Sequence, residues 1–261
     1  MHMRFIIIWF AILSVRCEPN KHIPAPETGQ HLAAILCLHD IGGKGKYSIS
    51  SENFHYLLEN LQNRFAVISL QSWFDSFMKP DQFNKPVIIL TFDDGYPSLR
   101  NMVIPELRKY GFGATFFIYL DRYNDNSPFF KDLAALEKQF EIGSHSFSHE
   151  NLIKMYEKDE RKFFREVYLS RRKLEYLTGK KITSWAWPYG YYNDKLVEIT
   201  KNAGYAIQTT TDYQITDLPL QRKHWPRFTL KSPGTKKQID SILKNLSERK
   251  IILTGKKNFS P

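Results

Sequence analysis

The sequence has only two cysteines among its 261 residues, so the chain can form at most one internal disulfide bond. No internal repeat or low-complexity tract is present. The glycines from Gly42 to Gly45 follow a strand-like run, but the G-x-x-x-x-G-K-[ST] spacing of a phosphate-binding loop is absent. Cys37 lies within that apolar run, so we favour a small buried thiol there over a disulfide with Cys17.

The N-terminus carries a run of nine hydrophobic residues after Arg4. Such a run is too short to span a bilayer, and a basic start with a short apolar core is typical of a secretory signal. A buried N-terminal strand is the alternative. We predict a signal peptide at residues 1–17 and an extended, proline-containing tether at residues 18–31. Cys17 stands where a lipoprotein signal places its lipidated cysteine, although Arg16 replaces the usual small residue. The sequence thus predicts export to the periplasm, the outer surface or a membrane-anchored position in the cell envelope.

The chain is basic, with 37 lysines and arginines against 27 acidic residues and a net charge of +10. Loss of residues 1–17 removes two arginines and no acid, which leaves a net charge of +8. This balance can favour acidic glycans, anionic lipid surfaces or nucleic acid. No nucleic-acid-binding motif is present and the basic residues are spread along the chain, so we interpret the charge as general surface charge and predict no nucleic-acid partner.

The first chemical signal is a pair of adjacent acids, Asp93 and Asp94. The apolar run at residues 87–90 predicts a buried parallel strand. Thr91-Phe92-Asp93-Asp94-Gly95 follows it, so the two acids stand where the strand ends. Two carboxylates are costly to bury unpaired, and Gly95 permits a tight turn. This layout is typical of a site at the C-terminal mouth of an α/β barrel or sheet. For the dipeptide alone, a solvated turn is the alternative.

The second signal is a pair of histidines four residues apart, His145 and His149. They face the same side if the segment is helical or tightly turned. Neutral imidazoles are common zinc ligands, and a catalytic metal takes three protein ligands plus an open position. With one of the two aspartates, these histidines would supply that set. Paired surface histidines are the alternative for the H-x-x-x-H spacing alone.

Three motifs together resemble those of the polysaccharide deacetylases, which are carbohydrate esterase family 4 and contain the NodB-like homology domain. In chain order they are Thr91-Phe92-Asp93-Asp94-Gly95, His145-Ser146-Phe147-Ser148-His149 and Trp187-Pro188-Tyr189-Gly190. The resemblance covers residues 32–230 and implies an α/β fold, a distorted (β/α)7-type barrel. Residues 231–261 are expected to form a C-terminal amphipathic helix and a basic tail.

The resemblance also implies a metal-dependent mechanism. The metal ligands would be Asp94, His145 and His149, with zinc favoured and cobalt, nickel or iron also compatible. Asp93 would take the proton of the attacking water as general base, and the backbone N–H of Tyr189 would stabilise the oxyanion. The substrate-binding mouth, where aromatic faces stack on sugar rings, would be formed by Trp187, Pro188 and Tyr189.

The chain departs from the common family pattern in two places. His39 ends a strand near the start of the domain, whereas the family's Leu-x-His motif, whose histidine protonates the leaving amine, usually lies at the C-terminal end. This order resembles the circularly permuted branch that includes the poly-β-1,6-N-acetylglucosamine deacetylases, with Cys37 in place of the leucine. Ala186 and Trp187 stand where the family commonly has an arginine that holds the catalytic aspartate. Arg227 is the candidate replacement, a plain surface arginine is the alternative, and no acidic partner is assigned to His39.

A long helix is predicted at residues 158–178 and is ended by Gly179. Five residues share its apolar face: Phe163, Val167, Ser170, Leu174 and Leu177. Its lysines and arginines would lie on a solvated outer face.

We therefore predict a monomeric, metal-dependent hydrolase that removes N-acetyl groups from an N-acetylglucosamine-containing polysaccharide, either an exopolysaccharide or a cell-wall glycan. Two alternatives stay open. One is a membrane-tethered glycan-binding protein with weak or no catalysis. The other is a hydrolase of small cyclic amides with the same fold.

Overall fold

The computed structural model describes residues 33–76, 83–214 and 224–248. The predicted signal peptide, the tether and Cys17 lie outside the described residues. The strands are β1 Ala33–Leu38, β2 Ala66–Ile68, β3 Val87–Phe92, β4 Ala114–Ile118, β5 Phe140–Ser144, β6 Ser184–Ala186, β7 Ile207–Thr209 and β8 Phe228–Thr229. The α-helices are α1 Ser51–Leu61, α2 Leu70–Asp75, α3 Ile104–Tyr110, α4 Pro128–Ala134, α5 Leu152–Lys158, α6 Glu160–Phe164, α7 Ser170–Thr178, α8 Asp194–Asn202 and α9 Thr235–Ser247.

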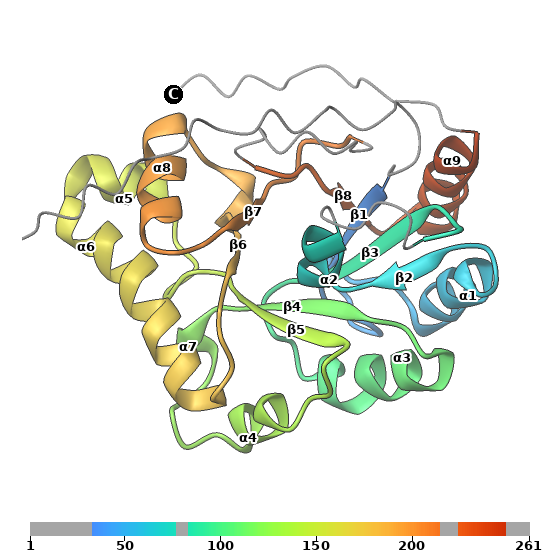
Figure 1. The fold of residues 1–261 in the computed structure, drawn as a ribbon, viewed down its shortest axis with the longest axis horizontal. Coiled ribbons are helices and arrows are strands. Elements are labelled where there is room, and N and C mark those ends of the chain that lie inside the picture. The colour runs from blue at the N-terminus through green and yellow to red at the C-terminus, as the bar shows by residue number, and fades with distance from the viewer. Residues whose placement is uncertain (1–32, 77–82, 215–223, 249–261) are drawn as a thin grey trace, which may run out of the picture.

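The strands form one parallel sheet that curls around on itself (Figure 1). Its order is β7-β6-β5-β4-β3-β1-β8, and β2 pairs with the first half of β3 beside this seven-strand path. A parallel bridge between Thr209 and Trp225 brings the segment before β8 against β7, while β8 itself pairs with β1. The predicted distorted α/β barrel is thus confirmed, with β2 as an eighth strand.

The alternation of side chains along each strand separates an interior from an outer layer. Residues of β1 and β3 that point inward, such as Ile35 and Ile89, form one apolar cluster with Phe117 of β4. Leu70 and Trp73 of α2 join this cluster, and α2 lies across the centre of the curled sheet in Figure 1. The short helix therefore closes the barrel at one end, which leaves the carboxyl ends of the strands as the open mouth.

Helices cover the outside of the sheet, and their apolar faces build the larger core with the outward-facing strand residues. Two π-helical segments continue directly into these helices. η3 Leu99–Val103 leads into α3, and η5 Arg165–Leu169 joins α6 to α7. The predicted helix at 158–178 begins at Glu160, because Asp159 is extended and caps α6 by accepting from Arg161 N at 3.0 Å. In the described part of the chain, no helix combines the length and the apolar character needed to cross a membrane.

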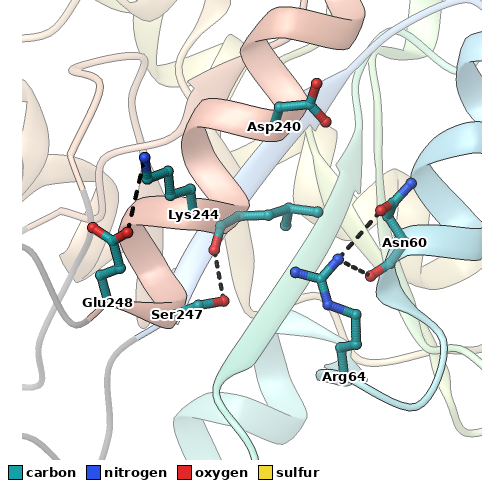
Figure 2. A pocket seen from close by; sticks show the side chains of 7 residues that line it. Asn60, Arg64, Asp240, Lys244, Ser247 and Glu248 are labelled. Carbon is teal, nitrogen blue, oxygen red and sulfur yellow. Dashed lines mark hydrogen bonds and ion pairs between the residues drawn. The ribbon is translucent and has the colours of Figure 1, made fainter.

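A cavity of about 390 Å³ lies between the ends of α1 and α9 (Figure 2). Its polar side chains already have partners. Arg64 donates to the carbonyl and the side-chain oxygen of Asn60, and Lys244 lies 4.0 Å from Glu248. The cavity therefore offers no cluster of unpaired reactive groups.

Gly143 of β5 allows the tight packing that leads into His145. A Cβ atom at this position would lie 2.4 Å from Phe117 Cε1 and 2.6 Å from Ser184 Oγ, and neither neighbour can move freely inside the sheet. We expect Gly143→Ala to lower the free energy of unfolding by about 1–3 kcal/mol, which chemical denaturation would measure. Gly45→Ala is the control, because its Cβ would make only an ordinary 3.5 Å contact with Ser48. Equal stabilities for the two variants would contradict this account of the packing.

Candidate active site

The predicted site residues come together at the carboxyl ends of the strands. Because the sheet is parallel, the segments that follow β1, β3, β5, β6 and β7 all open at the same mouth. The segments after β1, β3, β5 and β6 carry His39, Asp93, Asp94, His145, His149 and Tyr189, and Arg227 directly precedes β8.

Three ligand-type atoms converge on one point. Asp94 Oδ1 lies 3.5 Å from His145 Nε2 and 3.3 Å from His149 Nε2, and the two imidazole nitrogens are 3.2 Å apart. Ligands held about 2.0–2.1 Å from a tetrahedral zinc ion would be separated by about 3.3 Å. Asp94 Oδ1 is also buried without a hydrogen-bond partner among the described residues. The spacing and the orphaned oxygen both fit a divalent metal ion.

The backbone around the three ligands adopts unusual conformations that aim the side chains inward. Asp94, Ser146 and His149 have positive φ angles of 70°, 75° and 59°. Such conformations cost about 1–3 kcal/mol each and persist only when the surroundings enforce them. Here Ser146 Oγ accepts from the His149 N–H at 2.9 Å, and Glu166 Oε2 accepts from two further N–H groups of the turn at 2.8 Å. The H-x-x-x-H pair thus lies on a braced turn and not on a helix.

A further contact sets the tautomer of His145. Its Nδ1 lies 2.8 Å from the carbonyl oxygen of Ala186, which can only accept a hydrogen bond. The proton therefore resides on Nδ1, and the lone pair of Nε2 faces Asp94 and His149. Burial lowers the pKa of His145 to about 3 and also lowers that of His149. Both imidazoles are thus neutral at pH 7, the form that binds a metal.

Asp93 is clamped by Arg227. The guanidinium donates to both carboxylate oxygens at 2.7 Å, and both side chains are buried. Burial alone would raise the pKa of Asp93, but the charge of Arg227 and its hydrogen bonds to the carboxylate outweigh burial and hold that pKa well below its usual range. Arg227 also donates to Thr91 Oγ1 and to the Thr210 carbonyl, each at 3.0 Å. The structure therefore places Arg227 on Asp93 and excludes the alternative of a surface arginine.

His39 lies on the other side of Asp93. Atoms of Cys37, His39 and Asp93 fall within 4.8 Å of one another, and the Cys37 thiol donates to Asp93 Oδ2 at 3.4 Å. A metal ion is disfavoured here because the Arg227 cation already occupies the carboxylate. Burial lowers the pKa of His39. Its Nδ1 is buried without a hydrogen-bond partner in the described part of the chain, so the acidic partner that the sequence left unassigned is also not found there.

The aromatic residues after β6 divide between core and mouth. Tyr189 has a positive φ of 59°, is 58% exposed, and its ring centre lies 4.7 Å from that of His149. Pro188 is buried. Trp187 is fully buried and donates from Nε1 to Gln208 Oε1 at 3.1 Å, so the expectation that its face meets substrate needs correction. The alternating side chains turn Trp187 toward the outer core, where it contacts Trp185.

Two residues near the site were missed by the sequence analysis. Glu166 lies between Phe163 and Val167 on the apolar helix face, and an acid at such a position signals a buried partner. That partner is the His145–His149 turn. Arg122 stacks its guanidinium 4.1 Å from the ring centre of Tyr96 at the rim, and no local sequence pattern indicates this contact.

The chain is similar to known polysaccharide deacetylases in sequence and in fold. The family model for polysaccharide deacetylase matches residues 81–207. The chain is 33% identical over 114 residues to the peptidoglycan-N-acetylmuramic acid deacetylase PdaC of Bacillus subtilis. The matched region covers 43% of this chain and 23% of that protein. The chain is also 28% identical over 171 residues to a peptidoglycan-N-acetylglucosamine deacetylase of Bacillus cereus. That match covers 65% of this chain and 72% of that protein.

Further similarity extends to an exopolysaccharide enzyme and to solved structures. A poly-β-1,6-N-acetyl-D-glucosamine N-deacetylase of Staphylococcus aureus is 24% identical over 171 residues, 60% of this chain and 59% of that protein. A polysaccharide deacetylase from Bacillus cereus superposes with a TM-score of 0.67 at 25% identity, covering 81% of this chain and 68% of that one. IcaB from Ammonifex degensii superposes with a TM-score of 0.70 at 19% identity, covering 81% and 96%, which shows the shared fold. The matched region spans less than a quarter of PdaC.

The converging ligands predict a specific pattern of metal binding. We expect the chelated protein to take up one zinc ion per chain in a calorimetric titration, and His145→Ala to weaken that binding more than roughly 100-fold. Loss of an outer-shell partner already costs about 10–100-fold, and His145 would contact the ion directly. Asp93→Asn should retain the metal. His55→Ala, a half-exposed histidine on α1, is the control. Unchanged zinc affinity in His145→Ala would contradict the ligand assignment.

The Asp93–Arg227 pair predicts a pH-dependent loss of stability. Asp93 has a depressed pKa, so its contribution is present above its unfolded pKa near 4 and is lost as the pH falls through the folded value. In Arg227→Met the buried carboxylate stays unpaired, which should cost about 3–5 kcal/mol at pH 7. In this variant burial raises the pKa of Asp93, so its carboxylate should be protonated at low pH. The stability difference between wild type and Arg227→Met should then be smaller than at pH 7.

Denaturant titrations at pH 7 and pH 4 would measure the effect, and the double variant Asp93→Asn with Arg227→Met is the matched control. It should recover part of the lost stability at pH 7, because it removes the unpaired charge. A destabilisation of the single variant that is the same at both pH values would rule out this electrostatic account.

Proposed function

Since the chain belongs to the polysaccharide deacetylase family, we propose that it is a metal-dependent N-deacetylase of an N-acetylglucosamine-containing polysaccharide, an exopolysaccharide or a cell-wall glycan. The observation that carries the proposal is the juxtaposition of two units at one mouth. One is the metal-type cluster of Asp94, His145 and His149, and the other is the carboxylate of Asp93, clamped by Arg227. The similarity to peptidoglycan and poly-β-1,6-N-acetylglucosamine deacetylases supports the substrate class.

The chemistry follows from what each group can supply. A divalent ion held by Asp94, His145 and His149 would lower the pKa of water and polarise an amide carbonyl. Asp93 lies 3.8 Å from His145 Nε2, so its carboxylate is adjacent to that position, and its low pKa keeps it ionised and able to accept a hydrogen bond from water. The clamp by Arg227 fixes its orientation, which a general base requires.

The groups on either side of Asp93 would act on the substrate. His39 is the donor to the departing amine. Because its pKa is lowered, its imidazole is neutral in the resting site, and the proton that it passes to the amine is one released by the attacking water. The exposed ring of Tyr189 offers a face for a sugar, and its backbone N–H is the candidate oxyanion donor. We propose zinc as the ion, while cobalt, nickel and iron also accept two imidazoles and a carboxylate.

The place of action is proposed from residues 1–17 alone. The basic start, short apolar core and Cys17 support export, with lipid attachment at Cys17 as a way to hold the protein in the cell envelope. A polymer substrate outside the cytoplasm is consistent with that placement.

Acetate release from β-1,6- and β-1,4-linked N-acetylglucosamine oligomers tests the function. After chelation, re-addition of zinc should restore release, and Asp94→Ala should abolish it or lower it more than roughly 100-fold, because one of three ligands is lost. The preferred linkage would place the substrate. His55→Ala should retain the activity. No acetate from any oligomer, in protein shown to bind zinc, would refute the deacetylase; products from cyclic amides would then identify the related hydrolase.

A further inference from the structure

The loop after β1 presents an aromatic ring beside His39. The ring centres of Tyr47 and His39 are 5.1 Å apart, and Tyr47 is 43% exposed. Backbone hydrogen bonds from Gly42 N to the Ile49 carbonyl at 2.8 Å and from Ile49 N to the Asp40 carbonyl at 3.1 Å close the base of this loop. Tyr47 is therefore an exposed side chain held at a fixed place at the mouth.

Two lysines from distant parts of the sequence converge on this ring. Lys46 Nζ lies 5.7 Å and Lys231 Nζ 5.6 Å from the centre of Tyr47, both within the range of a cation–π contact. The backbone joins their loops, because Ser232 N donates to the Lys46 carbonyl at 2.9 Å. Lys46 forms no ion pair with any carboxylate of residues 33–76, 83–214 and 224–248. The lysines thus gather positive charge around one exposed aromatic face.

The acid in the loop, Asp40, does not cancel the charge of Lys46. Asp40 Oδ1 accepts a hydrogen bond from Ser98 Oγ at 2.7 Å, and its Oδ2 would be 2.0 Å from a Cβ at Gly43. These contacts place the carboxylate between the backbone of the loop and Ser98. Asp40 therefore acts as a brace for the loop that carries Tyr47.

We propose that Tyr47, Lys46 and Lys231 form a subsite for a sugar that bears an anionic substituent, a carboxylate or a phosphate, next to the unit that is deacetylated. The inference rests on the proposed function and names its substrate class as an acidic glycan. An aromatic face suits a sugar ring, and two ammonium groups beside it suit an anion. Deacetylation of a neutral polymer leaves cationic amines that a basic mouth repels, whereas acidic substituents keep such a polymer attracted to it.

Binding in a flow cell over the immobilised, zinc-loaded full chain tests the subsite, since fresh ligand replaces any that is consumed. The probes are an oligomer of alternating N-acetylglucosamine and N-acetylmuramic acid, the same oligomer with its carboxylates methyl-esterified, and a 6-phosphorylated N-acetylglucosamine oligomer. The acid should bind roughly fivefold to tenfold tighter than its ester, because each exposed ion pair contributes at most about 1 kcal/mol. That preference should fade at about 0.5 M salt. The phosphorylated probe distinguishes phosphate from carboxylate as the preferred anion.

Two double variants assign the preference to these residues. Lys46→Gln with Lys231→Gln should bring the ratio of acid to ester binding close to one. Lys44→Gln with Lys237→Gln removes two nearby exposed lysine charges that do not contact Tyr47, and should keep the ratio within about twofold of wild type. Matching thermal unfolding would show that all variants are folded. An equal loss in both double variants would overturn the subsite in favour of general surface charge.

The outcomes also separate the subsite from the proposed function. If the wild-type protein releases acetate yet binds the acidic oligomer and its methyl ester equally, the subsite is refuted and the deacetylase function stands. If a lysine-dependent preference for the acid is seen without acetate release from any polymer, the subsite stands and the deacetylase is refuted.

Discussion

The buried ion pair between Asp93 and Arg227 is the constraint on which the site depends. Two charges removed from water are tolerated only when they pair closely and their remaining hydrogen-bonding groups are satisfied. Arg227 meets this demand with both oxygens of Asp93, with Thr91 and with the Thr210 carbonyl. Those partners come from β3 and from the segment after β7, so the pair ties the end of the domain to its middle and helps to close the barrel.

The same pair gives two neighbouring aspartates different properties. Arg227 holds the pKa of Asp93 low, whereas burial raises the pKa of Asp94, whose Oδ1 faces the two imidazole nitrogens. One carboxylate is thus fixed as an ionised group beside the mouth, and the other needs a cation to be stable when charged. The division between base and metal ligand follows from what each side chain touches, although the residues are adjacent in sequence.

The mouth is assembled from strained turns on a rigid sheet. Asp94, His149 and Tyr189 all have positive φ angles, and Glu166 and Ser146 supply the hydrogen bonds that brace one of these turns. The closely packed apolar interior of the barrel makes the sheet beneath these turns rigid. Aromatic rings and basic side chains then complete the rim, with Tyr189 on the metal side and Tyr47 on the His39 side.

The sequence alone determined the features that depend on short-range patterns. Apolar runs located the strands, and the three motifs located Asp93, Asp94, His145, His149 and Tyr189, because parallel strands place their carboxyl ends together. Only the tertiary structure decided the long-range pairings: that Arg227 meets Asp93 across 134 positions, that Glu166 braces the histidine turn, that Trp187 points into the core, and that Lys46 and Lys231 converge on Tyr47. These pairings arise from how the sheet curls and how its outer helices pack, and no local pattern records the distance between segments far apart in the chain.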